Sequence, residues 1–134
     1  MTAAASRRTA PAPGPAPRNQ VGLSGRVPAE PEERVLPSGD RIVVLRVVVP
    51  RPPDPARAGR DGGRTPRRAV DTIDVVCWSA CTRRSAGGLR EGDWVEVEGA
   101  LRRRFFAVGA GRQSRYEVEA TALRRLARGV PRGT

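Results

Sequence analysis

The residue types that build most catalytic and metal-binding sites are absent or scarce in this chain. It has no histidine, and Cys77 and Cys81 are its only cysteines. Two cysteines without a histidine do not complete a four-ligand zinc site, and they are too few for a disulfide framework. We therefore expect no metal, no cofactor and reduced cysteines, as is usual for a cytoplasmic protein.

Enzymatic machinery is missing as well. The chain has no lysine and no nucleophile elbow. The acids Glu96 and Glu98 alternate with valines, which is typical of the solvated face of a strand. No apolar run approaches the ~20 residues of a membrane span, and the N-terminus has no signal-peptide core. The sequence predicts a non-enzyme that is not bound to a membrane.

Positive charge is what the chain has in excess. All 25 basic residues are arginine, and the formal net charge is +11. Arginine carries a planar, permanently charged fork that binds phosphates and stacks on flat rings. A small protein this basic is expected to bind a polyanion, most often a nucleic acid.

Composition divides the chain into one domain with two tails and a long internal loop. The Pro- and Ala-rich residues 1–18 and the basic residues 127–134 are predicted to be disordered. Residues 19–126 form the expected domain, which contains a flexible basic loop over 50–70.

Within that domain apolar residues recur with a period of two, which is typical of strands. In "DTIDVVCW", for example, Ile73 and Val75 are predicted to point inward, and Val76 and Trp78 outward. The helix predicted over 79–89 ends at two glycines, and the last strand is expected to finish as a short helical turn. The five expected strands are 19–27, 41–49, 71–78, 93–106 and 114–126.

Five strands with one short helix between the third and the fourth match an all-β Greek-key barrel, the OB-fold. The fourth strand, "GDWVEVEGALRRRFF", places Val95, Val97 and Leu101 inward. It ends in three arginines and two phenylalanines, which is unusual for a strand end that only needs to be solvated. The faces and loops of this fold often bind oligonucleotides.

The order of these motifs resembles the bacterial single-stranded DNA-binding protein family. The likeness covers roughly residues 19–126, from "NQVGLSGRV" through "PSGDRIVVLRVVV" and "DTIDVVCWS" to "GRQSRYEVEA". Its most specific part is the order Leu-x-x-Gly-x-x-Val-x-Val-x-Gly-x-Leu-x-x-Arg between Leu89 and Arg104.

The resemblance implies that bases of single-stranded DNA stack on outward rings in a basic groove. It places Trp78 and Phe106 at two of the family's stacking positions. Arg102 and Arg104 alternate with Phe106 on one face of their strand, and they are expected to bind phosphates. Further candidate nucleic-acid-binding arginines are Arg26, Arg46 and Arg115. The family also implies a homo-oligomer, a tetramer in most members, acting in DNA replication, repair or recombination at the nucleoid.

The sequence departs from the family in ways that bear on function. Thr72 occupies a third aromatic position, and the chain ends in a basic segment without the acidic tip that recruits replication and repair proteins. Trp94 stands where the family has a polar residue, and we expect it at a subunit contact. Two alternatives therefore stay open: an OB-fold module that binds RNA, or an interaction protein that has lost most nucleic-acid binding.

Overall fold

The structure is a computed structural model that describes residues 14–52 and 69–129. The described residues contain six strands and one helix. Three ranges lie outside the described residues, namely 1–13, 53–68 and 130–134. They include most of the two tails that were predicted to be disordered and most of the predicted 50–70 loop. The elements are β1 (Val21–Arg26), β2 (Glu32–Val35), β3 (Arg41–Pro50), β4 (Val70–Cys77), α2 (Ala80–Gly87), β5 (Trp94–Val108) and β6 (Gly111–Ala127).

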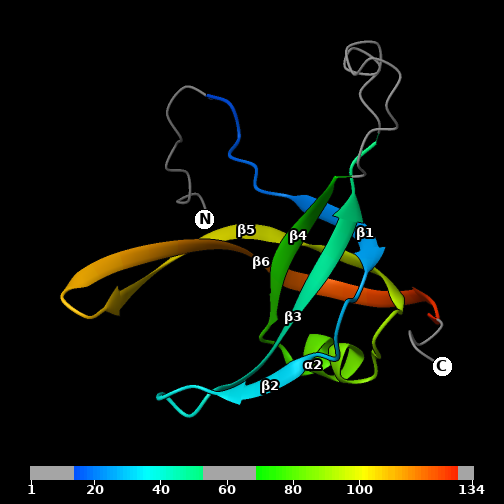
Figure 1. Ribbon diagram of the computed structural model, residues 1–134. Coiled ribbons are helices and arrows are strands. Elements are labelled where there is room, and N and C mark those ends of the chain that lie inside the picture. The colour runs from blue at the N-terminus through cyan, green and yellow to red at the C-terminus, as the bar shows by residue number, and fades with distance from the viewer. Residues whose placement is uncertain (1–13, 53–68, 130–134) are drawn as a thin grey trace, which may run out of the picture.

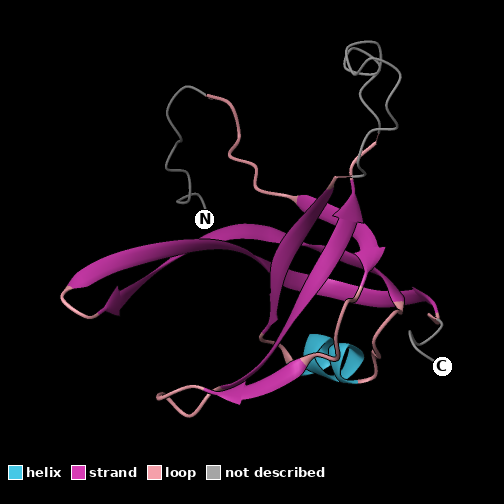
Figure 2. Ribbon diagram, viewed as in Figure 1, coloured by secondary structure: helices cyan, strands magenta, loops and turns pink. Residues whose placement is uncertain are grey.

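Five of the strands close into a ring. The sheet runs β1-β5-β6-β4-β3-β2, and β1 also pairs with β3 where Arg26 lies opposite Val48. The crossing strands of this barrel and α2 at one end are visible in Figures 1 and 2. The structure confirms the predicted five-stranded OB-fold barrel with one helix between its third and fourth strands. The short strand β2, which pairs only with β3 outside the ring, was not predicted.

Alternation along the strands fills the barrel with small branched side chains. A barrel of this size has an interior that such side chains can fill, and the core is mostly valine. Its buried members are Val27, Val43, Leu45, Val47, Val75, Cys77, Ala86, Leu89, Val95, Val97, Val118, Ala120 and Leu123.

The helix α2 supplies Ala86 to this core, and Leu89, two residues after the helix, also packs there. Ser79 caps its start by accepting a hydrogen bond from the backbone N–H of Thr82, 3.1 Å away. The helix ends at Gly88, whose N–H bonds back to carbonyls of the last turn. The cap at Gly88 agrees with the prediction that the helix ends at two glycines, although the observed helix is shorter than the predicted range 79–89.

Three local expectations were wrong. Val76 is buried instead of facing solvent, because it lies in the middle of the sheet between Val44 of β3 and Glu119 of β6. The end of β6 is a strand and not a helical turn, because it continues to pair with β5 through Ala127. Leu101, predicted to point into the core, is 45% exposed.

The exposure of Leu101 has a geometric cause. The pairing of β5 with β6 shifts register between Glu98 and Gly99, and a Cβ on Gly99 would collide with the backbone oxygen of Glu119. Such a bulge bends a strand pair. Leu101 also lies beyond the last pair between β1 and β5, Val21–Gly99. It therefore keeps the inward direction, but it lies at the end of the barrel and stays exposed.

A buried carboxylate, Asp93, joins three segments at the opposite end of these strands. Its Oδ2 accepts a hydrogen bond from the N–H of Arg90 at 2.9 Å, and its Oδ1 accepts one from the N–H of Gly129 at 3.0 Å. Its backbone oxygen accepts from the N–H of Val27 at 2.9 Å. Asp93 therefore fastens the residues after β1 and β6 to the start of β5.

The same contacts change how Asp93 titrates. Burial by itself raises the pKa of this carboxyl, but the hydrogen bonds from Gly129 and Arg90 and the positive charges of Arg125 and Arg128 outweigh burial. The pKa of Asp93 therefore lies below its ordinary value.

We expect Asp93→Asn to lower the free energy of unfolding at neutral pH by about 1–3 kcal/mol, because an amide NH₂ cannot accept from a backbone N–H and one buried donor loses its partner. A group whose folded pKa is lowered stabilises the fold above its unfolded pKa of about 4 and loses that effect as pH falls through the folded value. Urea titrations at neutral and acidic pH should therefore show the difference from the parent shrinking in acid. The control is Asp40→Asn, which changes an exposed carboxylate. Equal stability of parent and Asp93→Asn at neutral pH would contradict this role.

Candidate nucleic-acid interface

Beyond the barrel, β5 and β6 continue as a two-stranded ribbon. They stay paired as far as Val108 and Gly111, and the chain reverses at Gly109, whose φ of +59° suits glycine. Figure 1 shows the ribbon sweeping away from the barrel. Residues 101–116 are all exposed, so the ribbon has two solvent-facing sides.

Directly paired residues of antiparallel strands share a side, and this sorts the ribbon residues. The outer ribbon face continues the solvent side of the barrel and consists of Arg102, Arg104, Phe106, Val108, Gly111, Gln113, Arg115 and Glu117. The inner ribbon face continues the core side and consists of Leu101, Arg103, Phe105, Ala107, Arg112, Ser114 and Tyr116.

A groove of about 500 Å³ lies where the outer ribbon face meets the solvent side of β3 and β4. Arg104 and Arg115 line it from the ribbon and Arg46 from β3. Its apolar lining includes Ile42 and Val44 of β3, and Ile42 is buried although it is not part of the barrel core. The groove therefore brings together three arginines that the sequence analysis selected from three different strands.

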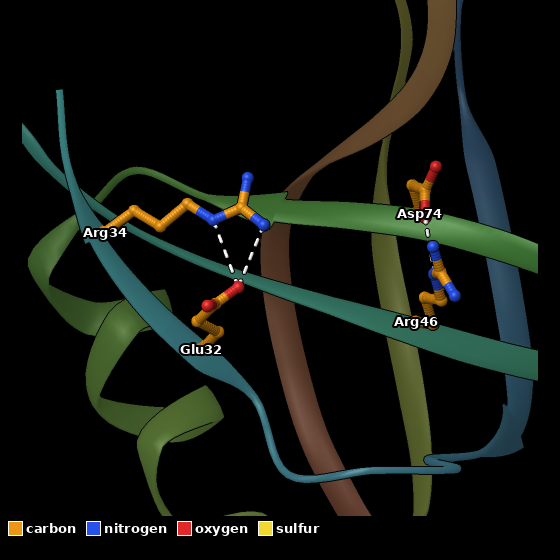
Figure 3. Close-up of polar contacts among 4 residues, drawn as sticks. All are labelled: Glu32, Arg34, Arg46 and Asp74. Atoms are coloured by element: carbon orange, nitrogen blue, oxygen red, sulfur yellow. Dashed lines mark hydrogen bonds and ion pairs between the residues drawn. The ribbon is translucent and has the colours of Figure 1, made fainter.

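Most of the arginines around this groove have an acidic partner. Arg46 donates from Nε to Asp74 at 3.3 Å, and Figure 3 shows this pair beside the Arg34–Glu32 pair of β2. The ion pairs on the ribbon side are Arg102–Glu119 at 3.0 Å and Arg104–Glu117 at 3.5 Å. Partly exposed pairs of this kind are worth about 0–1 kcal/mol. A phosphate can therefore replace the carboxylate at little cost.

The two candidate rings are partly exposed. Phe106 is 38% exposed and lies on the outer ribbon face, with the guanidinium carbon of Arg115 5.8 Å from its ring centroid. Trp78 is 36% exposed and follows the last residue of β4. Its backbone oxygen accepts a hydrogen bond from Arg83. Each ring thus offers a surface on which a base can stack.

The register gives the spacing of these rings. Trp78 lies two residues beyond Val76, which pairs with Glu119 of β6. Gln113, the partner of Phe106, lies six residues before Glu119. Eight positions at ~3.3 Å each place the rings ~26 Å apart along the strand direction, so a single nucleotide cannot reach both.

Arg26 and Trp94 lie apart from the groove. Arg26 is half-buried on β1, where it pairs with Val48 of β3 and with Trp94 of β5. Trp94 is exposed and shares its side of β5 with Glu96 and Glu98. Thr72, at the third aromatic position of the family, is exposed opposite Val48.

The described ends of the predicted 50–70 loop are fastened together. The N–H of Arg51 donates to the oxygen of Ala69, and its guanidinium pairs with Asp71 at 2.8 Å. The hydrogen bond to Asp71 raises the pKa of Arg51 and correspondingly lowers the pKa of Asp71. This contact fixes where the loop leaves the sheet.

The sequence analysis missed the acidic partners and the inner ribbon face. "YEVEA" carried a signal for the acids, because Glu117 and Glu119 alternate with the buried Val118 and so must share a side with Arg115. The inner face gave a weaker signal. Phe105 and Tyr116 occupy core-side positions, and only the point where the barrel ends makes them exposed.

Comparisons with known proteins agree with this geometry. A model of the single-strand binding protein family matches residues 18–126. Among solved structures, the chain is similar to the Plasmodium falciparum SSB complex with ssDNA, with 20% sequence identity and a TM-score of 0.66 over 84% of this chain and 98% of that one. At this identity the likeness concerns the fold. No curated protein matches the chain. No helix in the described part of the chain is long and apolar enough to cross a membrane.

Proposed function

Since the chain belongs to the single-strand binding protein family, we propose that it binds single-stranded DNA without strong sequence preference. The observation that carries the proposal is the groove that gathers Arg46, Arg104 and Arg115 beside the Phe106 ring. Phosphates bind the arginines in place of their carboxylate partners, and bases stack on the rings. Because every base has a flat face, stacking selects for a single strand and not for a sequence.

The strand would run along the outer face from Phe106, past the groove, toward Trp78. The ~26 Å between the rings along the strands leaves room for several nucleotides, in keeping with the ~4–16 nucleotides that one OB-fold barrel covers. Such binding would serve DNA replication, repair or recombination.

Competition among equal lengths of single-stranded DNA, RNA and duplex DNA separates this function from an RNA-binding module. Binding of none of the three would favour the interaction protein.

Loss of either ring should weaken binding. We expect Trp78→Ala and Phe106→Ala each to cost about 1–3 kcal/mol of binding to oligo-dT, measured by fluorescence anisotropy. The matched control is Leu126→Ala, which removes an exposed apolar side chain near the far end of β6. In a Trp94→Phe background Trp78 is the only tryptophan, so quenching of its emission by oligo-dT reports this ring directly. If the double variant Trp78→Ala, Phe106→Ala binds as the parent does, the ring assignment is wrong.

Arginine contacts predict a steep dependence on salt. Each phosphate contact on a single strand contributes about −0.7 to the slope of log K against log salt, so five or six contacts give about −4. Replacing Arg102 and Arg104 with glutamine should flatten the slope by about one unit or more. The control is Arg124→Gln, because Arg124 is also exposed and ion-paired, to Glu96 at 2.8 Å, but it lies on the barrel and not on the ribbon. A slope unchanged by the double substitution would show that these arginines are solvated surface.

We also propose that the protein is a homo-oligomer, a tetramer as the family resemblance implies. Trp94 is a large exposed ring on a strand face that otherwise carries Glu96 and Glu98, and a subunit contact would cover it. Light scattering at micromolar concentration should give about four times the 14.4 kDa mass of the chain. Trp94→Glu should lower that mass, because it would bury a charge. A parent that scatters as a monomer would refute the assembly.

A further inference from the structure

The inner ribbon face exposes more aromatic surface than the outer one. Phe105 is 59% exposed and Tyr116 is 56% exposed, compared with 38% for Phe106 and 36% for Trp78. Leu101 lies on the same side and is also exposed. Exposed apolar side chains that gather on one face of a soluble protein mark an interaction site.

Arg103 holds these rings together. Its guanidinium carbon lies 4.8 Å from the centroid of Phe105 and 5.4 Å from that of Tyr116. Its Nε donates to the hydroxyl of Ser114 on the opposite strand, at 3.2 Å. Two rings and one guanidinium plane are therefore arranged in advance, and bases stack on both kinds of surface.

Charge identifies the kind of partner. The inner ribbon face carries Arg103 and Arg112, and none of its residues is acidic. On the outer ribbon face, Glu117 pairs with Arg104. A second copy of the inner face would bring like charges together, whereas a polyanion with flat bases matches both the charge and the rings.

We propose that the inner ribbon face is a second stacking surface for single-stranded DNA, built from Phe105, Tyr116 and Arg103. This inference rests on the proposed function of the outer face. A strand longer than the outer face can hold passes round the ribbon, and its bases stack on the inner rings. The ribbon thus binds one strand on both of its sides.

Tyr116 is the only tyrosine of the chain, so 3-fluorotyrosine gives the full-length protein a single ¹⁹F resonance. Two oligo-dT probes are needed. One has about 8 nucleotides, within the range that one barrel covers, and the other about 30, well beyond it. We expect the long probe to shift the resonance and the short probe to leave it in place, while anisotropy shows that both bind.

The double variant Phe105→Ser, Tyr116→Ser measures the same surface by affinity. Binding of the long probe should weaken by roughly ten-fold or more, and binding of the short probe should be unchanged. The unchanged short probe also shows that the ribbon still presents Phe106. Should the short probe weaken as well, Arg103→Gln takes the place of the double variant. This variant keeps both rings and should weaken binding of the long probe only. The matched comparison is Phe106→Ala, which should weaken both probes.

The proposal requires both the shifted resonance and the weaker long-probe binding. Suppose that the long probe binds and that this binding depends on Phe106. If the probe then does not shift the resonance, or if the inner-face variants bind it as tightly as the parent does, the inner face is not a DNA surface and the proposed function stands. If neither probe binds, the proposed function fails and this inference fails with it. A variant that lowers the mass in light scattering without changing DNA affinity would assign the inner face to contacts between copies, which also overturns the proposal.

Discussion

The ribbon formed by the outer halves of β5 and β6 has no core beneath it, and the candidate site depends on this constraint. An isolated two-stranded hairpin is marginally stable in water, so side-chain pairs across the strands must hold this one. The outer ribbon face uses ion pairs such as Arg104–Glu117, and the inner face uses Arg103 stacked on Phe105 and Tyr116. The groups that stabilise the ribbon are the same groups that would bind a nucleic acid.

This double use explains why net charge alone describes the site poorly. The chain carries +11, but around the groove and the ribbon Arg46 pairs with Asp74, Arg102 with Glu119 and Arg104 with Glu117. A phosphate that binds there exchanges one anion for another. The free energy of binding is therefore less favourable than the number of arginines suggests. In return, the carboxylates reduce the repulsion among the arginines in the free protein.

The sequence was sufficient for the barrel because the signals that specify it are local. Alternation places Val43, Leu45 and Val47 on one side of β3, and two glycines end the helix α2. The place where the barrel ends is not local. It depends on the bulge at Gly99 and on how closely Glu119 approaches it, so alternation gave Leu101 the right direction and the wrong environment. Candidate arginines could be selected by their side of the strand, but their grouping around one groove and their carboxylate partners depend on register.

The use of arginine in place of lysine bears on the small number of rings. Only 4% of the residues are aromatic, and Thr72 replaces a ring that the family resemblance leads one to expect. A guanidinium group is flat and can stack on a ring while its N–H groups bind an acceptor, as Arg103 does with Phe105 and Ser114. An ammonium group offers no such plane. Bases also stack on guanidinium planes, so in the proposed site Arg103 and Arg115, each beside a ring, would enlarge the stacking surface beyond what the aromatic residues alone provide. A chain rich in arginine can therefore bind single strands with few rings, provided that the strands hold each guanidinium flat against a neighbour.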